Sequence, residues 1–318
     1  MMRRFREIGL AASLIALACF SAAAAETIRV GEAVPQSFTF TLLDFGMKHG
    51  LFVKEGVTVA RATFGGPVKQ QQALAAGSID IGLGVGLDLG FVAKGAPVKG
   101  VAAMAGPPLD TAIIVPPQSP IKTVADLKGH TVGISSLASI LSWMIGEIAV
   151  REGWPRDAIH QVASGPPTAQ VALLKSGQLD ASGSDLAPAL QLESTGEVRI
   201  LVRFGDIITQ SLNNVIFATD DYIAARPGDL RAFLRGWFAT IAYARQHREE
   251  TVADMTALLG IDRKFVETIY DRQMPMYLDD GHFPKAGLAL IARAVVDVHM
   301  LDARPDMEKL YTEAYLPK

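Results

Sequence analysis

Cysteine is almost missing from this 318-residue sequence, and long apolar segments are absent after residue 20. The one cysteine, Cys19, lies close to the N-terminus. A membrane-spanning helix needs about 20 consecutive apolar residues, and no later stretch supplies them. The rest of the chain can therefore form no disulfide and carry no thiol nucleophile, so it must be stabilised by core burial.

Motifs for metals, phosphate binding and hydrolysis are also missing. The pairs His-Glu-x-x-His and Cys-x-x-Cys do not occur. The segment 82–86 is rich in glycine but lacks the Lys-Ser/Thr of a phosphate-binding loop, and Gly-x-Ser-x-Gly is absent. The six histidines stand at no spacing typical of metal ligands: His49, His130, His160, His247, His282 and His299. The sequence thus predicts no metal, no cofactor and no catalytic residue.

The N-terminus has the pattern of an export signal. Three arginines within residues 1–6 precede the apolar run 8–20, and small residues end at Ala25. This pattern predicts a signal peptide over residues 1–25 and a periplasmic protein. Two alternatives remain open, a retained N-terminal anchor and a lipid on Cys19, although Ala16 stands where lipoproteins usually have a bulkier aliphatic residue.

The charge balance is mildly acidic. Loss of the predicted signal peptide would remove three arginines and one glutamate, which takes the net charge from −3 to −5. A negative chain argues against nucleic acid and against an anionic membrane surface as partners.

One segment of the chain occurs twice, one hundred residues apart. Residues 63–80 read TFGGPVKQQQALAAGSID, and residues 163–180 read ASGPPTAQVALLKSGQLD. Six aligned positions are identical: Gly65/Gly165, Pro67/Pro167, Gln70/Gln170, Leu74/Leu174, Gly77/Gly177 and Asp80/Asp180. Each copy reads as a glycine-proline loop, a short helix that stops at glycine, and the start of a strand. The repeat predicts two similar α/β lobes with a ligand cleft between them.

The order of strand and helix patterns extends this prediction to the whole chain. Strands alternate with helices over 28–105 and again over 131–203, which indicates parallel sheets, and the chain after 221 is nearly all helical. We therefore predict lobe 1 from residues 26–116 and 218–318, with lobe 2, residues 117–217, inserted into it. The crossings 113–117 and 216–219 would form a two-stranded hinge, and the helical C-terminal tail would pack back on lobe 1.

Several short motifs together resemble a known group of proteins. They are Gly50-Leu51-Phe52, Glu55-Gly56, Ala73-Leu74, Gly77 with Asp80-Ile81-Gly82, Gly95-Ala96-Pro97-Val98, Ser119-Pro120-Ile121, Asp126-Leu127-Lys128-Gly129 and the turn 177–180. In combination they resemble periplasmic binding proteins of the nitrate/sulfonate/taurine class. The resemblance implies the type II periplasmic binding protein fold, a monomer that closes around one small molecule, and delivery to an ABC permease. The same fold includes enzymes of pyrimidine-precursor synthesis, but their cysteine-rich motifs have no counterpart after Cys19.

Ligands in open α/β sheets bind at the carboxyl ends of strands, on loops that open helices. This rule selects the loops 34–38, 64–67 and 84–88 in lobe 1, and 135–139, 164–168 and 183–185 in lobe 2. From them we expect a ligand site that includes Gln36, Ser37, Phe38, Gly65, Gly66, Asp88, Ser135, Ser136, Ser139, Thr168 and Asp185.

Each of these residues has a plain structural alternative. The serines and Thr168 could simply cap helices, and the glycines could serve turn geometry. Phe38 and Phe64 could stack on a planar ligand, whereas Trp143, inside a helix, is expected in the core.

The charges of these loops leave the ligand class open. None of the six loops contains Arg or Lys, and two contain an aspartate, Asp88 or Asp185. Helix dipoles alone could hold an anion, an aspartate could pair with an amine, or both aspartates could face solvent or cap helices. We favour a neutral or zwitterionic organic molecule over nitrate. An adaptor that presents ligand to a membrane sensor and an exported enzyme remain alternatives to a transport receptor.

Overall fold

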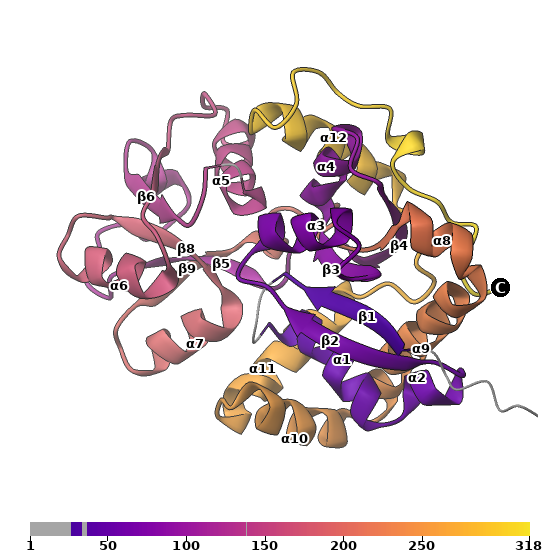
Figure 1. The fold of residues 1–318 in the computed structure, drawn as a ribbon. Helices are drawn as coiled ribbons and strands as arrows, with labels where there is room; N and C mark the ends of the chain where they lie inside the picture. The colour runs from indigo at the N-terminus through magenta and orange to yellow at the C-terminus, as the bar shows by residue number, and fades with distance from the viewer. Residues whose placement is uncertain (1–26, 34–36, 138) are drawn as a thin grey trace, which may run out of the picture.

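Two five-stranded sheets organise the chain (Figure 1). The structure is a computed structural model that describes residues 27–33, 37–137 and 139–318. The first sheet has the order β2-β1-β3-β10-β4, and the second has the order β7-β6-β8-β5-β9. Their strands are β1 (Thr27–Glu32), β2 (Thr58–Thr63), β3 (Ile81–Val85), β4 (Val98–Ala105), β5 (Thr111–Val115), β6 (Thr131–Ile134), β7 (His160–Ala163), β8 (Ala181–Asp185), β9 (Arg199–Arg203) and β10 (Asn214–Thr219).

The two sheets share one topology. In the first sheet β1 pairs in parallel with β2 and β3, and β10 runs antiparallel between β3 and β4. In the second sheet β6 pairs in parallel with β7 and β8, and β5 runs antiparallel between β8 and β9. Two mixed α/β sheets in two lobes confirm the predicted fold class.

The sheets exchange one strand each, and this differs from the predicted crossings. The strand β5 lies within the expected lobe 1 but pairs in the second sheet. The strand β10 lies mostly within the expected lobe 2 but pairs in the first sheet. The chain therefore passes between the sheets at residues 106–110 and 204–213, not at 113–117 and 216–219. The physical reason is that β5 and β10 are both short buried apolar runs, and such a run does not indicate which sheet receives it. With the sheet boundaries moved in this way, a discontinuous first lobe with an inserted second lobe remains our proposal for the domains.

The sequence repeat corresponds to a structural repeat. After β2 and after β7 the chain enters a nine-residue helix with proline in its first turn, α3 (Pro67–Ala75) and α6 (Pro167–Lys175). Each helix is followed by a glycine with positive φ, Gly77 at 64° and Gly177 at 73°, which suits a residue without a Cβ atom. In both copies the aspartate that follows accepts a backbone N–H from the neighbouring strand at 2.8 Å.

Helices cover the two sheets. They are α1 (Phe38–Lys48), α2 (Leu51–Lys54), α4 (Leu89–Ala93), α5 (Ile140–Arg151), α7 (Leu186–Ser194), α8 (Asp220–Ala225), α9 (Pro227–Gln246), α10 (Arg248–Leu259), α11 (Arg263–Gln273) and α12 (Lys285–Asp297). No helix in the described ranges is both long enough and apolar enough to span a bilayer.

The C-terminal helices pack on the first lobe, as predicted, but they also reach the second. The helix α9 buries Phe233 and Trp237 against α1 and α2, in a core cluster with β1 and β3. In addition, α11 packs against α7 and α12 packs against α5 (Figure 1). The tail is therefore part of the connection between the lobes.

Candidate functional site

Polar side chains gather where the chain crosses between the sheets. We call Asp110, Asp185, Asn213, Asn214 and Tyr277 the crossing cluster. The Nδ2 atom of Asn213 donates to both carboxylate oxygens of Asp110 at 3.1 Å and to Asn214 Oδ1 at 3.0 Å. Asn214 in turn donates to the carbonyl oxygen of Gly84 at 3.3 Å; Gly84 lies near the end of β3, within the segment 84–88 that was predicted as a ligand loop. A line of hydrogen bonds thus leads from the first crossing to a predicted ligand loop of lobe 1.

The same cluster reaches a ligand loop of lobe 2. The backbone N–H of Leu186, directly after Asp185, donates to the carbonyl oxygen of Asp110 at 2.7 Å. Tyr277 lies on the other side, where its buried hydroxyl bonds Thr39 Oγ1 at 3.0 Å, in the first turn of α1. The crossing cluster therefore joins three of the six predicted loops or the helices that they open.

The electrostatics of this cluster are unfavourable to additional negative charge. Burial raises the pKa of Asp110 to about 7, and repulsion from the Asp185 carboxylate raises it as well, while the bond from Asn213 acts in the opposite direction. Burial also raises the pKa of Asp185. The negative charge of Asp110 adds to burial in raising the pKa of Tyr277. Two carboxylates that repel each other would be relieved by a cation placed between them.

Asp185 is accessible although its surroundings are dense. The residue is exposed, stands at the start of α7, and makes no side-chain bond to the helix N-terminus. A ligand could reach it without any rearrangement of the fold.

The predicted residues of lobe 1 have mixed outcomes. Gln36 lies outside the described residues, and Ser37 precedes α1 without a side-chain capping bond. Gly65 is exposed, and Gly66 has φ of 135°, which meets the structural alternative of turn geometry. Phe38 was expected in a loop before a helix that the sequence predicts from Phe40, but α1 begins two residues earlier, and Phe38 is its first residue and is buried in the core.

Asp88 is not presented to solvent. It is 2% exposed and accepts the backbone N–H of Val85 at 3.1 Å, so it closes the turn after β3. Burial raises its pKa to about 7. Asp88 therefore has the structural role that was the alternative to ligand binding: it stabilises the turn.

In lobe 2 the predicted serines after β6 are accessible or cap a helix, whereas Thr168 after β7 does not have the capping role that was expected as its structural alternative. Ser135 and Ser136 are exposed, and the hydroxyl of Ser139 caps α5 by accepting the backbone N–H of Ser142 at 3.2 Å. Thr168 does not cap α6, because Pro166 occupies the cap position and Thr168 is already inside the helix. Its side chain is exposed near the start of α6.

Two further aromatic residues, Trp143 and Phe64, can also be placed. Trp143 is 1% exposed and belongs to the core, as predicted. Phe64 is partly buried and packs against the same core cluster, which removes part of its ring from any ligand.

Sequence reasoning missed most of the crossing cluster. Asp110, Asn213 and Asn214 come just before strands or at their start, whereas the rule for open sheets selects residues after strands. Lys69 was also missed, because it lies two positions after the predicted loop 64–67. Its Nζ atom lies 4.0 Å from the position that a Cβ atom on Gly65 would occupy, and its counterpart in the repeat is Ala169. Comparison of the two repeat copies could have identified Lys69 as a charge that only lobe 1 has.

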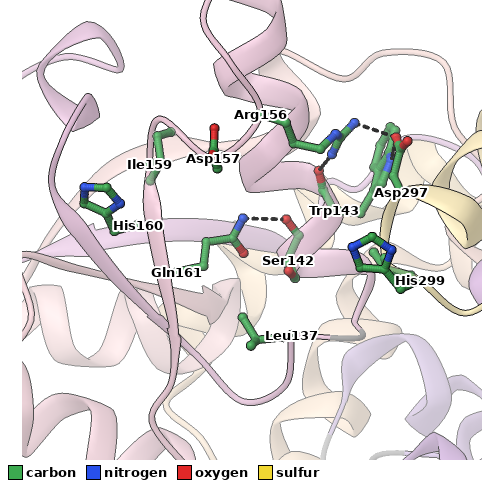
Figure 2. A pocket seen from close by; sticks show the side chains of 11 residues that line it. Leu137, Ser142, Trp143, Arg156, Asp157, Ile159, His160, Gln161, Asp297 and His299 are labelled. Carbon is green, nitrogen blue, oxygen red and sulfur yellow. Dashed lines mark hydrogen bonds and ion pairs between the residues drawn. The ribbon is translucent and has the colours of Figure 1, made fainter.

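A cavity of about 580 Å³ lies elsewhere, between α5 and the end of α12 (Figure 2). Its lining includes Trp143, Arg156, Gln161, Asp297 and His299. Of the predicted ligand loops only the one after β6 contributes, through Leu137. This cavity is therefore distinct from the crossing cluster.

Comparison with known proteins gives a family and a fold. The model of the family described as "NMT1/THI5 like" matches residues 38–251. An aliphatic sulfonates-binding protein of Escherichia coli (strain K12) is 30% identical over an alignment of 213 residues. This alignment covers 64% of this chain and 63% of the relative, so somewhat less than two thirds of that relative is matched.

Solved structures with this fold include binding proteins and an enzyme. The periplasmic aliphatic sulphonate binding protein SsuA from Escherichia coli matches with a TM-score of 0.76 at 21% identity, over 90% of this chain and 92% of that one. The alkanesulfonate-binding protein SsuA from Xanthomonas axonopodis pv. citri bound to MOPS matches with a TM-score of 0.73 at 20% identity, over 90% and 98%. A desulfurization enzyme, DszB, matches with a TM-score of 0.65 at 15% identity, over 91% and 97%. At these identities the likeness shows the fold alone.

Proposed function

Because the chain belongs to the NMT1/THI5 like family, we propose that it is a periplasmic receptor that binds a small organic solute between its two lobes and delivers it to an ABC permease. The sulfonate-binding relatives and the shared two-lobed fold support this proposal. The apolar, arginine-led segment 1–20 supports export, with lipidation of Cys19 as the alternative form of the mature protein.

We further propose that the solute carries an amine. The observation behind this is the carboxylate pair of the crossing cluster, Asp110 and Asp185: burial raises the pKa of both carboxyl groups, and the charge of Asp185 raises that of Asp110 further. An ammonium group beside both carboxylates would remove the repulsion and form charge-assisted hydrogen bonds. Sulfonate alone would add a third negative charge to the same place.

An acidic group on the same solute would have a partner in lobe 1. Lys69 is in the first turn of α3, where the helix dipole also favours negative charge. Lobe 1 would then hold the anionic end and lobe 2 the cationic end. A zwitterion that bridges the lobes binds the closed form better than the open one, which is the requirement for ligand-driven closure.

The alternatives differ in what they require. A sensor adaptor would use the same site and differ only in its membrane partner, so the neighbouring genes separate it from a transport receptor. The match to DszB shows that this fold also supports an enzyme. The receptor interpretation is preferred because the relative that is 30% identical to this chain is a binding protein.

A thermal-shift series with matched probes tests the ligand class. We expect 3-aminopropanesulfonate to raise the melting temperature of the chain without its signal peptide, because it carries both charges, and propanesulfonate to have a much smaller effect. MOPS, which has a sulfonate and a tertiary amine, is a third probe.

Two variants complete this test. Asp185→Asn should weaken binding of 3-aminopropanesulfonate about tenfold or more, because a hydrogen bond to a charged group contributes roughly 1.5–3 kcal/mol. Asp302→Asn, an exposed carboxylate of the C-terminal tail, is the matched control and should bind like the wild type. Equal shifts from the sulfonate with and without its amine, or undiminished binding by Asp185→Asn, would contradict the amine proposal.

A further inference from the structure

Two helix contacts flank the crossing segments and join the lobes independently of the backbone. The C-terminal helices α11 and α12 lie next to α7 and α5 of the second lobe, and Figure 1 shows these contacts on opposite sides of the strand β5. The start of α12 also packs on the second crossing, since a Cβ atom on Gly287 would lie 2.9 Å from the backbone of Ser211 and Leu212. The C-terminal tail thus touches both sides of the connection between the lobes.

The contact between α5 and α12 is a partly buried polar network, and Figure 2 shows its part around Trp143, Arg156 and Asp297. The Nε1 atom of Trp143 in α5 donates to Asp297 Oδ2 in α12 at 2.9 Å. The same carboxylate pairs with Arg156 Nη2 at 2.7 Å. The guanidinium groups of Arg156 and Arg293 lie 5.5 and 5.3 Å from the ring centre of Trp143. An indole that is 1% exposed is therefore held by two charges of α12 and by Arg156, which lies in the segment after α5.

A second carboxylate ties the same two helices together. Glu147 in α5 is 4% exposed and accepts bonds from three arginines. Arg151 and Arg156 come from lobe 2, at 3.2 and 3.4 Å, whereas Arg293 comes from α12 at 2.9 Å. Separation of α12 from α5 would leave buried charges with fewer partners, which is costly in a low-dielectric environment.

The contact between α7 and α11 is mainly apolar. Ala187 and Leu190 of α7 pack against the hydrophobic cluster of the first lobe, which includes Val266 and Ile269 of α11. At its edge Arg272 of α11 forms an ion pair with Asp206 in the second crossing. This contact also loses buried surface if the lobes slide apart.

We propose that these two contacts are the pivots of lobe movement. Two fixed contacts on either side of the crossings leave one rotation that preserves both, about the line that joins them. Opening and closing about this line keeps the Trp143 and Glu147 networks intact, whereas twisting or sliding of the lobes breaks one contact. The C-terminal tail would then restrict the lobes to a single closing motion, and this holds whatever solute the cleft binds.

Distance measurements between the lobes test the proposal without any ligand. The chain without its signal peptide has no cysteine, so spin labels at Val68→Cys in α3 and Val162→Cys in β7, both exposed, report one interlobe distance. With the double substitution Arg293→Gln and Asp297→Asn we expect a wider distance distribution with a shifted mean. The amide oxygen that Asp297→Asn introduces can still accept the bond from Trp143, so the loss is confined to charge pairing.

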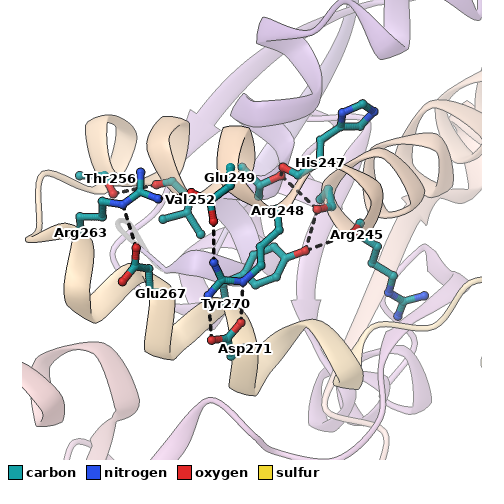
Figure 3. Close-up of polar contacts among 12 residues, drawn as sticks. Arg245, His247, Arg248, Glu249, Val252, Thr256, Arg263, Glu267, Tyr270 and Asp271 are labelled. Carbon is teal, nitrogen blue, oxygen red and sulfur yellow. Dashed lines mark hydrogen bonds and ion pairs between the residues drawn. The ribbon is translucent and has the colours of Figure 1, made fainter.

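The matched control breaks an ion pair that stays within the tail. Arg248 of α10 and Asp271 of α11 pair at 2.8 Å on the surface, and Figure 3 shows that this pair joins two neighbouring helices of the tail. Arg248→Gln with Asp271→Asn should leave the interlobe distribution as narrow as in the labelled parent. If the double variant at Arg293 and Asp297 does not fold, Arg293→Gln alone gives the same test, because Glu147 retains Arg151 and Arg156. An unchanged distribution in a folded pivot variant, or equal broadening in the control, would overturn the proposal.

Discussion

Buried carboxyl groups are the residues with the clearest consequences for stability. Glu32 is 2% exposed, pairs with Arg61 at 3.2 Å through one oxygen, and has no partner for the other among the described residues. Burial raises its pKa to about 8 and that of Asp88 to about 7. Both groups favour the protonated form in the folded state, so each should destabilise the fold as the pH rises.

The effect of Asp88 can be isolated by substitution. Between about pH 4 and pH 7 the unfolded chain has released this proton while the folded protein retains it, so the free energy of unfolding falls as the pH rises through that window. Asp88→Asn keeps an oxygen for the N–H of Val85 and removes the titration.

We therefore expect the variant to gain stability relative to wild type on going from pH 4 to pH 8. The gain should be on the order of a few kcal/mol at most. Urea unfolding at both pH values measures it, and a difference that stays constant with pH would show that Asp88 is ionised in the fold.

The sequence predicted which polar residues follow strands, but it did not predict which of their side chains are buried. Ser139 stands before an apolar helix, and its capping role was one of two interpretations offered by that position. Asp88 follows the glycine-containing strand β3 and Asp185 ends the glycine-containing strand β8, yet Asp88 is enclosed and Asp185 is exposed. The difference arises from the segments that pack over each loop. These segments are distant in the sequence, so the local sequence pattern does not predict them.

At the scale of elements, the duplicated helix shows how a repeat in sequence becomes a repeat in structure. In α3 the Nε2 atom of Gln70 donates to the carbonyl oxygens of Gly31 and Leu83, both at 2.8 Å. In α6 Gln170 donates to the carbonyl oxygen of Gly165 at 2.8 Å and accepts from Ser182 at 2.6 Å. Both buried glutamines attach the helix to its sheet or loop, so they hold the ends of the predicted ligand loops in place.

Replacement of Gln70 should therefore lower the free energy of unfolding markedly. Gln70→Leu removes both donors from buried carbonyl groups, and we expect a loss of roughly 2–4 kcal/mol in the free energy of unfolding. Gln72→Leu, two residues along on the exposed face of α3, is the control and should change stability by about 0.5 kcal/mol or less. Chemical denaturation of the two variants compares them directly, and equal losses would show that the hydrogen bonds of Gln70 contribute little.

At the scale of the whole molecule, the two-lobed plan followed from the repeat and from the alternation of strands and helices. The exchange of β5 and β10 between the sheets did not, because each strand lies beside partners that are distant in the sequence. The crossing cluster depends on that exchange, since it places Asp110 and Asn213 next to each other across 103 positions of the chain. Global topology, more than local pattern, therefore determines the candidate site.

The position of a bound solute tests the central claim most directly. We predict that a crystal structure of the protein with the best probe of the thermal-shift series has the solute between the lobes, with its amine beside Asp110 and Asp185 and contacts to loops of both sheets. A solute bound outside the space between the lobes, for example in the cavity between α5 and α12 beside Trp143, would contradict it.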